Sequence, residues 1–241
     1  MNVKDEKMRW KAILWDFDGT LADTGEDVWE SLRYAAELCG GTLPEGFTKD
    51  SSNLGKSVKE IYGKLTPYPG EGQYARFEEL VRIHYRRKNP YVHTCYYPGI
   101  EELIAVTGKQ GVRHFIITMK PREALKNIFL KKGWKPFFEE SVSPDSFEGT
   151  EKSKKEMIAY ILEKYQMQEK DCVYVGDTWS DIRAARENRI SCIAAAYGDG
   201  DEAMLRREQP DYLVWEPEGL MRIMEGHASA EGSGNSGAPE G

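Results

Sequence analysis

Residues 13–20 read Ile-Leu-Trp-Asp-Phe-Asp-Gly-Thr, an apolar run that ends in two aspartates separated by one residue. Residues i and i+2 of an extended strand point to the same side, so Asp16 and Asp18 are expected to face one site beyond a strand end. Gly19 permits a sharp change of chain direction after them. Two carboxylates this close repel each other unless one is protonated or a cation lies between them. The run therefore predicts a buried strand that ends in an acidic site, although a strand closed by an Asx-type turn would give the same pattern.

A second apolar run ends in the same way. Residues 173–181 read Val-Tyr-Val-Gly-Asp-Thr-Trp-Ser-Asp, which places Asp177 at a strand end and Asp181 four residues later. Acidic residues favour the first turn of a helix, and this preference alone would account for Asp181. It does not account for an aspartate at the end of a buried strand, so we expect Asp177 to act as a ligand.

A third apolar run, residues 115–118, ends in the hydroxyl group of Thr118, and Pro121 then suits the first position of a helix. A hydroxyl group and free backbone N–H groups before a helix make an anion site. Ligands of open parallel sheets bind beyond the carboxyl ends of the strands. We therefore expect Thr118 to share one site with the aspartates of the other two strand ends.

Short apolar runs alternate with amphipathic stretches along most of the chain. The expected strands cover residues 12–17, 112–118, 172–176, 191–197 and 211–214. The expected helices cover residues near 100–110, 121–132, 153–166 and 179–188. Such alternation predicts parallel strands joined by right-handed crossovers, with helices on both faces. The expected fold is an α/β, doubly wound, Rossmann-like parallel sheet with an inserted helical domain.

The alternation is interrupted once. Between residues 23 and 95 the apolar residues have helical spacing, and a loop rich in proline and glycine separates two helical stretches. We expect residues 23–95 to form a helical cap, and residues 1–22 and 96–227 to form the catalytic core. Residues 228–241 are small and polar, which predicts a disordered tail.

Composition narrows the class of protein. The net charge of −7 argues against a nucleic-acid partner, because duplex binding needs a cationic surface. No apolar run approaches the roughly 20 residues of a membrane-spanning helix, and the N-terminal residues do not resemble a secretory signal. The four cysteines and four histidines have no zinc-like spacing. We expect a cytoplasmic protein with reduced cysteines and no membrane partner.

In their order along the chain, these features resemble the motifs of the haloacid dehalogenase superfamily. The resemblance rests on DFDGT at residues 16–20, on Thr118, on a lysine before a helix and on GDTWSD at residues 176–181. It covers roughly residues 10–215, and the insertion after the first motif is similar to the helical cap of phosphoglycolate phosphatase-like members.

The resemblance implies a role for each matching residue. Asp16 would be the nucleophile that attacks phosphorus, and Asp18 would be the general acid and base. Mg²⁺ would bind the Asp16 carboxylate, the main-chain carbonyl group of Asp18 and the carboxylate of Asp177, with Asp181 in support. Thr118 and the backbone N–H group of Met119 would hold the phosphoryl oxygens. Members often have asparagine at the position of Met119, so a side-chain contact there is not expected.

The family pattern also requires a lysine beside the nucleophile, because phosphoryl transfer depends on neutralising charge. Residues 151–158 contain three lysines. One family spacing selects Lys154 and another selects Lys152; we favour Lys154 and keep Lys152 as the alternative.

The implied activity is Mg²⁺-dependent hydrolysis of a small phosphomonoester, such as phosphoglycolate, a nucleotide or a sugar phosphate. A phosphosugar mutase would use the same phosphoaspartate, and a non-catalytic phospholigand-binding module would keep the same fold. Substrate selection is expected in the cap, where Arg33, Lys56 and Arg76 are candidates that we do not assign. The partner is a small phosphorylated metabolite, and the protein is expected to be a monomer or a homodimer.

Overall fold

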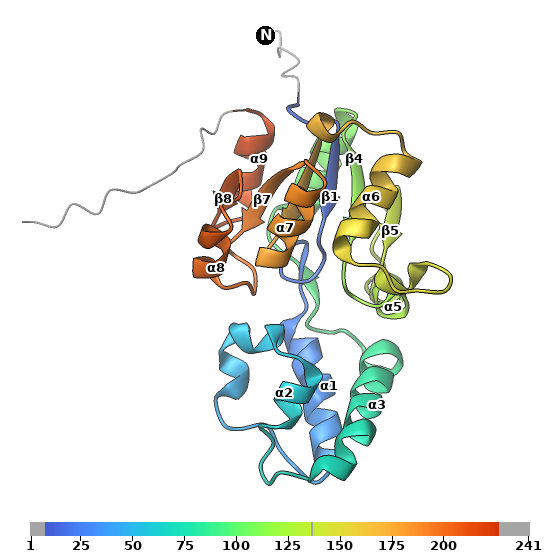
Figure 1. The fold of residues 1–241 in the computed structure, drawn as a ribbon, viewed down its shortest axis with the longest axis vertical. Coiled ribbons are helices and arrows are strands. Elements are labelled where there is room, and N and C mark those ends of the chain that lie inside the picture. Colours follow the sequence, from blue (N-terminus) through green and yellow to red (C-terminus); the bar gives the residue numbers. More distant parts are fainter. Residues whose placement is uncertain (1–7, 136, 227–241) are drawn as a thin grey trace, which may run out of the picture.

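The core of the molecule is a parallel sheet. The computed structural model describes residues 8–135 and 137–226, without the side chains of residues 51 and 52. Within these residues, six parallel strands follow the order β5-β4-β1-β6-β7-β8 (Figure 1). Their bounds are β1 Ala12–Trp15, β4 Arg113–Ile117, β5 Glu140–Val142, β6 Cys172–Gly176, β7 Ser191–Ala195 and β8 Tyr212–Val214.

Helices cover both faces of the sheet, as the alternating pattern predicts. One face packs against α4 Ile100–Lys109, α5 Arg122–Lys132 and α9 Glu218–Met224. The other face packs against α6 Lys154–Lys164, α7 Trp179–Glu187 and α8 Glu202–Arg207. Short 3₁₀ turns lie at Pro144–Ser146 and Glu169–Asp171. The chain has the α/β fold with a doubly wound parallel sheet that the sequence predicts.

Successive residues of β1 point into opposite halves of this core. Ile13 and Trp15 belong to the first apolar cluster, and Ala12 and Leu14 belong to the second. All four residues are at most 1% exposed, because a central strand with helices on both faces has no solvent side. The continuous apolar run before Asp16 is the sequence signature of this environment.

A helical insert, residues 24–94, interrupts the core after its first strand. Its helices are α1 Gly25–Leu38, α2 Val58–Tyr62 and α3 Tyr74–Ile83, which continues into a π-helical turn, η4 His84–Lys88. Short 3₁₀ turns lie at Phe47–Lys49, Ser51–Gly55 and Glu71–Gln73. The insert has an apolar cluster of its own and lies as a separate body below the sheet, on the side where β1 ends (Figure 1).

Two short antiparallel strands, β2 Ala22–Asp23 and β3 Cys95–Tyr96, carry the chain between the insert and the core. The expected boundaries of the cap, residues 23 and 95, fall within these two strands. The functional division of the chain into a cap and a catalytic core stays a prediction. The expected disordered tail, residues 228–241, lies outside the described residues.

Several short elements were not predicted. The edge strand β5 is a three-residue strand whose sequence, Glu-Ser-Val, contains a single apolar residue. The helices α8 and α9 were also missed; they have six and seven residues. Elements this short show too few periods of an apolar pattern to be recognised. None of the described helices has the length and apolarity needed to cross a membrane.

Candidate active site

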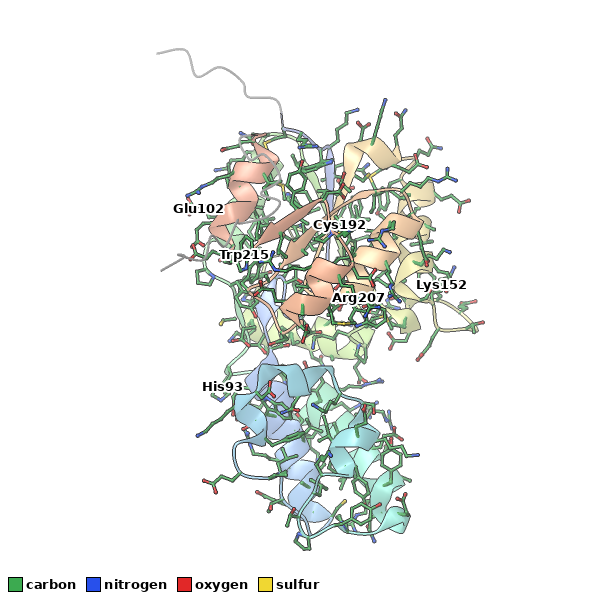
Figure 2. All side chains as sticks on the ribbon, turned by 60° about the vertical axis from the view of Figure 1, so that its left-hand side comes forward. His93, Glu102, Lys152, Cys192, Arg207 and Trp215 are labelled. Atoms are coloured by element: carbon green, nitrogen blue, oxygen red, sulfur yellow. The ribbon has the colours of Figure 1, made fainter. Side chains whose placement is uncertain are left out.

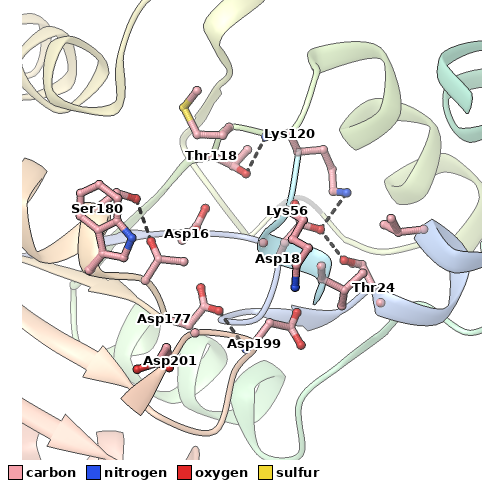
Figure 3. A pocket seen from close by; sticks show the side chains of 18 of the residues that line it. Asp16, Asp18, Thr24, Lys56, Thr118, Lys120, Asp177, Ser180, Asp199 and Asp201 are labelled. Atoms are coloured by element: carbon pink, nitrogen blue, oxygen red, sulfur yellow. Dashed lines mark hydrogen bonds and ion pairs between the residues drawn. The ribbon is translucent and has the colours of Figure 1, made fainter. Parts of the chain in front are cut away.

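The three strand ends that the sequence singles out are neighbours in the sheet. Strand β1 lies between β4 and β6, so Asp16, Thr118 and Asp177 follow adjacent strands at the same edge. All three residues line a pocket of about 680 Å³ between the core and the insert (Figure 3). The core side of this pocket also includes Asp18, Lys120, Lys154 and Asp199, and the insert contributes Thr24, Val28, Leu54, Lys56 and Glu60.

Asp16 contacts a buried lysine. The Nζ atom of Lys154 lies 3.0 Å from Oδ2 of Asp16 and also donates to Oδ1 of Asp181. Lys154 is the first residue of α6, because Ser153 and Glu156 form a capping box that begins the helix there. The alternative, Lys152, does not line the pocket, and its Nζ atom lies 4.7 Å from the centre of the Phe147 ring. The geometry therefore favours Lys154.

Asp177 is held at the bottom of the site by the loops that follow β1 and β7. Its Oδ1 atom accepts a hydrogen bond from Thr20 Oγ1 at 3.3 Å, and its Oδ2 atom accepts one from the backbone N–H of Asp199 at 2.9 Å. Gly19, with φ +70°, passes so close that a Cβ atom on it would lie 2.2 Å from Oδ2 of Asp177. Only glycine fits this turn without moving the carboxylate.

Asp181 both begins a helix and belongs to the site. Its Oδ2 atom accepts hydrogen bonds from the backbone N–H and the hydroxyl group of Thr178, which caps α7. Its Oδ1 atom accepts from Lys154. Asp181 therefore has both of the roles considered from the sequence. Its Oδ2 atom caps the start of α7, and its Oδ1 atom contacts Lys154 in the site.

The carboxylates of Asp16, Asp177 and Asp181 form a buried acidic cluster, with one oxygen of each within 4.8 Å of the others. Carboxylate oxygens are the ligands that hard divalent cations prefer. Among the described residues, one lysine, Lys154, forms ion pairs with members of this cluster. The negative charge of the three carboxylates therefore exceeds the positive charge beside them. The cluster therefore fits a divalent metal ion. The Asp18 side chain is not part of this cluster.

Burial also changes the acidity of this cluster. Desolvation raises the pKa of Asp16 to about 7, against the opposing effect of Lys154. Burial, followed by the charges of Asp16 and Asp181, holds the pKa of Asp177 well above its usual range. Both shifts reflect negative charges gathered in a poorly solvated place, where a bound cation would be stabilising.

The Asp18 side chain points toward the insert. Its Oδ1 atom accepts from Thr24 Oγ1 and forms an ion pair with Lys120 Nζ at 2.7 Å. Lys120 is 5% exposed and also donates to the hydroxyl group of Tyr85, a residue of the insert. Asp18 is thus positioned by one residue of the core and one at the start of the insert.

Thr118 lies on the side of the pocket opposite Asp177 (Figure 3), and Met119, the next residue, also lines the pocket. Thr118 is buried, and its hydroxyl group accepts a hydrogen bond from the backbone N–H of Lys120 at 3.1 Å. The turn before α5 is therefore closed by this side chain. The Met119 side chain is 54% exposed and lines the pocket without a polar group.

Of the three cations considered in the insert, one lines the pocket. Lys56 does so and donates to Oδ1 of Asn53. Arg33 instead forms an ion pair with Glu26, and neither Arg33 nor Arg76 lines the pocket.

Sequence reasoning did not identify Thr20, Thr24, Lys120 and Asp199 as site residues. A signal existed for Asp199, because it lies in a Gly-Asp-Gly segment, residues 198–200, just beyond the end of β7. The contact of Lys120 with Tyr85 depends on the position of the insert, and the local sequence contains no sign of it.

Comparisons with known proteins agree with this architecture. The family model described as haloacid dehalogenase-like hydrolase matches residues 13–195. The chain is 26% identical over 232 residues to a 5'-nucleotidase of Pseudomonas aeruginosa, covering 93% of this chain and 100% of the relative. It is also 26% identical to a phosphoglycolate phosphatase of Aquifex aeolicus, covering 90% and 98%. A crystal structure titled as a putative phosphatase from Clostridium difficile has a similar fold, with a TM-score of 0.78, 24% identity and coverage of 90% and 99%.

Proposed function

Because this chain belongs to the haloacid dehalogenase-like hydrolase family and is a phosphatase, we propose that it hydrolyses a small phosphomonoester through a phosphoaspartate on Asp16. The observation that carries the proposal is the contact of buried Lys154 with Asp16, beside a cluster of carboxylates that faces the pocket. A nucleophilic carboxylate, a fixed cation and a metal-binding cluster are the parts that phosphoryl transfer requires.

In the first step, an oxygen of Asp16 attacks phosphorus and the bond from phosphorus to the leaving oxygen breaks. Asp18 gives its proton to the leaving oxygen. In the second step, Asp18 takes a proton from water as the water oxygen attacks phosphorus, which releases phosphate and restores Asp16. Two residues on the same strand end, both lining the pocket, support this division of roles.

The other residues of the site would stabilise charge on the phosphoryl group. Lys154 lies against the nucleophile, and Thr118 with the N–H group of Met119 would bind phosphoryl oxygens where β4 ends. Asp16, Asp177 and Asp181, with the main-chain carbonyl group of Asp18, would hold Mg²⁺. When bound, Mg²⁺ neutralises charge on the phosphoryl oxygens and on the surrounding carboxylates.

We propose that the substrate is a small phosphorylated metabolite whose leaving group lies against the insert. The named activities of the relatives, on nucleotides and on phosphoglycolate, support this class. The pocket offers apolar side chains at Val28 and Leu54 and a cation at Lys56, so it accommodates more than a phosphate group. The free cysteines support a cytoplasmic location, which we also propose.

The test is phosphate release from an aryl phosphate and from a panel of phosphoglycolate, nucleotides and sugar phosphates. We expect release with Mg²⁺, none with EDTA, and loss of activity in Asp16→Asn. Full activity of Asp16→Asn would disprove the phosphoaspartate. Isomerisation of a sugar phosphate with little free phosphate would indicate a mutase, and binding without turnover would indicate a binding module.

A further inference from the structure

A second group of potential metal ligands lies at the base of the insert, away from the pocket described above. One carboxylate oxygen of Asp27, one of Glu30 and one ring nitrogen of His93 lie within 4.8 Å of one another. Asp27 and Glu30 are three residues apart on α1 and so share one face of that helix. His93 precedes β3 and lies at the junction of the insert with the core (Figure 2).

Asp27 has an incompletely satisfied carboxylate. The residue is 0% exposed, and its Oδ2 atom accepts hydrogen bonds from the backbone N–H and the hydroxyl group of Thr94, both at 2.6 Å. Its Oδ1 atom is buried and has no hydrogen-bond donor among the described residues. No lysine or arginine of the described residues forms an ion pair with Asp27. An ionised oxygen buried without a partner is costly, and a cation would remove that cost.

The neighbouring side chains can supply the rest of a coordination sphere. Nε2 of His93 lies 3.3 Å from Oε1 of Glu30, and these side chains are 49% and 32% exposed. Two ligand atoms that each lie 2.1 Å from a tetrahedral ion are about 3.4 Å apart. The partly exposed side chains of His93 and Glu30 can adjust to this separation, and solvent can reach the fourth position of the ion.

We propose that Asp27, Glu30 and His93 bind a Zn²⁺ ion. An imidazole nitrogen with two carboxylates suits zinc, whereas magnesium prefers a set composed of oxygens and water. The ion would join α1 to the residues just before β3, and β2 and β3 are the strands that carry the chain between insert and core. Binding would thus make the base of the insert more rigid.

The test measures zinc itself, by equilibrium dialysis of the full chain with excess Mg²⁺ present to occupy the acidic cluster of the pocket. We expect the wild type to bind one more zinc ion per chain than His93→Ala or Glu30→Gln. Both positions are partly exposed, so these variants should fold. Glu37→Gln, an exposed position on the same helix, is the matched control and should bind as the wild type does.

Thermal unfolding gives a second readout that does not depend on activity. Zinc at about 100 times its dissociation constant should raise the unfolding midpoint of the wild type by about 5 °C, and by much less in His93→Ala. Equal zinc binding and equal midpoint shifts in the wild type and both variants would overturn the proposal. So would the absence of zinc binding by the wild type, since Asp27 would then serve only to hold Thr94.

Discussion

Lys152 and Lys154 lie two residues apart at the start of α6 and have opposite surroundings. Lys154 is buried between two carboxylates, whereas Lys152 lies over an aromatic ring outside the pocket. The boundary set by the Ser153 capping box determines which lysine points inward. These two residues therefore form a natural matched pair for a test of the charge beside Asp16.

We expect Lys154→Met to lower kcat by about 10²–10³-fold, because a fixed charge next to the reacting group is lost. Lys152→Met should stay within about twofold of the wild type, as expected for a residue outside the pocket. Steady-state kinetics with an aryl phosphate would measure both, and circular dichroism would show whether Lys154→Met is folded. Equal loss in the two variants would contradict the assignment.

His114 is a buried histidine that the proposed chemistry does not use. Its Nδ1 atom accepts a hydrogen bond from Trp15 Nε1 at 3.0 Å, so its proton is on Nε2, which lies 3.0 Å from Thr107 Oγ1. Burial lowers the pKa of His114 from 6.5 to about 4. A second proton on this ring would therefore break the contact with Trp15 in a place where a charge is poorly solvated.

This shift predicts acid sensitivity. Between about pH 6.5 and pH 4 the unfolded chain binds a proton at His114 that the folded chain does not, so the free energy of unfolding falls as pH falls. When the pH is lowered from 7 to 5, we expect the free energy of unfolding of the wild type to fall by about 2 kcal/mol more than that of His114→Gln, which cannot titrate at this position. Urea unfolding at both pH values would measure this. An equal fall in the free energy of unfolding of both proteins would show that His114 is not the cause of the acid sensitivity.

At the scale of elements, the turn after β1 fixes the distance between two motifs that are far apart in the sequence. Gly19 has a positive φ and nearly touches the Asp177 carboxylate, whereas Gly40, at the end of α1, has a φ of +79° with open space around it. A side chain at either position would cause similar backbone strain. Only at Gly19 would it also clash with the Asp177 carboxylate.

We therefore expect Gly19→Ala and Gly40→Ala each to lose about 1–2 kcal/mol of stability from left-handed backbone strain. Gly19→Ala should in addition lose at least about tenfold in kcat/KM, because Asp177 must move, and a 1 Å misplacement can cost about 10²-fold. Urea unfolding and steady-state kinetics separate the two effects. Full activity of Gly19→Ala would mean that the position of Asp177 is not critical.

Elements of the core could be predicted where burial requires a long run of apolar residues in the sequence. The apolar runs before Asp16, Thr118 and Asp177 identified central strands and, with them, one edge of the sheet, because parallel strands bring their carboxyl ends together. Strand β5 was missed because an edge strand of three residues needs little apolar character. Lys120 was missed for a different reason: its contact with Tyr85 forms only when the insert has folded against the core.

For the whole molecule, this last contact links the insert to the core. The Nζ atom of Lys120 touches Asp18 in the core and Tyr85 in η4 of the insert, and it lies 4.5 Å from the centre of the Tyr85 ring. Burial raises the pKa of Tyr85 to about 12, so its hydroxyl group stays protonated and accepts a hydrogen bond from the lysine. The contact exists only when the insert lies against the pocket, and it therefore favours this closed arrangement over any in which the insert moves away.

Tyr85→Phe removes the hydroxyl group and keeps the ring, so we expect it to weaken closure without disturbing Asp18. The loss of one hydrogen bond to a charged group, about 1–2 kcal/mol, corresponds to roughly tenfold in kcat/KM, and it should appear mainly as a higher KM because closure accompanies binding. Lys120→Met also removes the contact with Asp18, so kcat should fall as well. Tyr68→Phe, which changes a hydroxyl group bonded to Glu71 on the surface of the insert, is the matched control and should leave both constants unchanged. If Tyr85→Phe lowered kcat at constant KM, Tyr85 would act on the chemical step, and the closure role would be wrong.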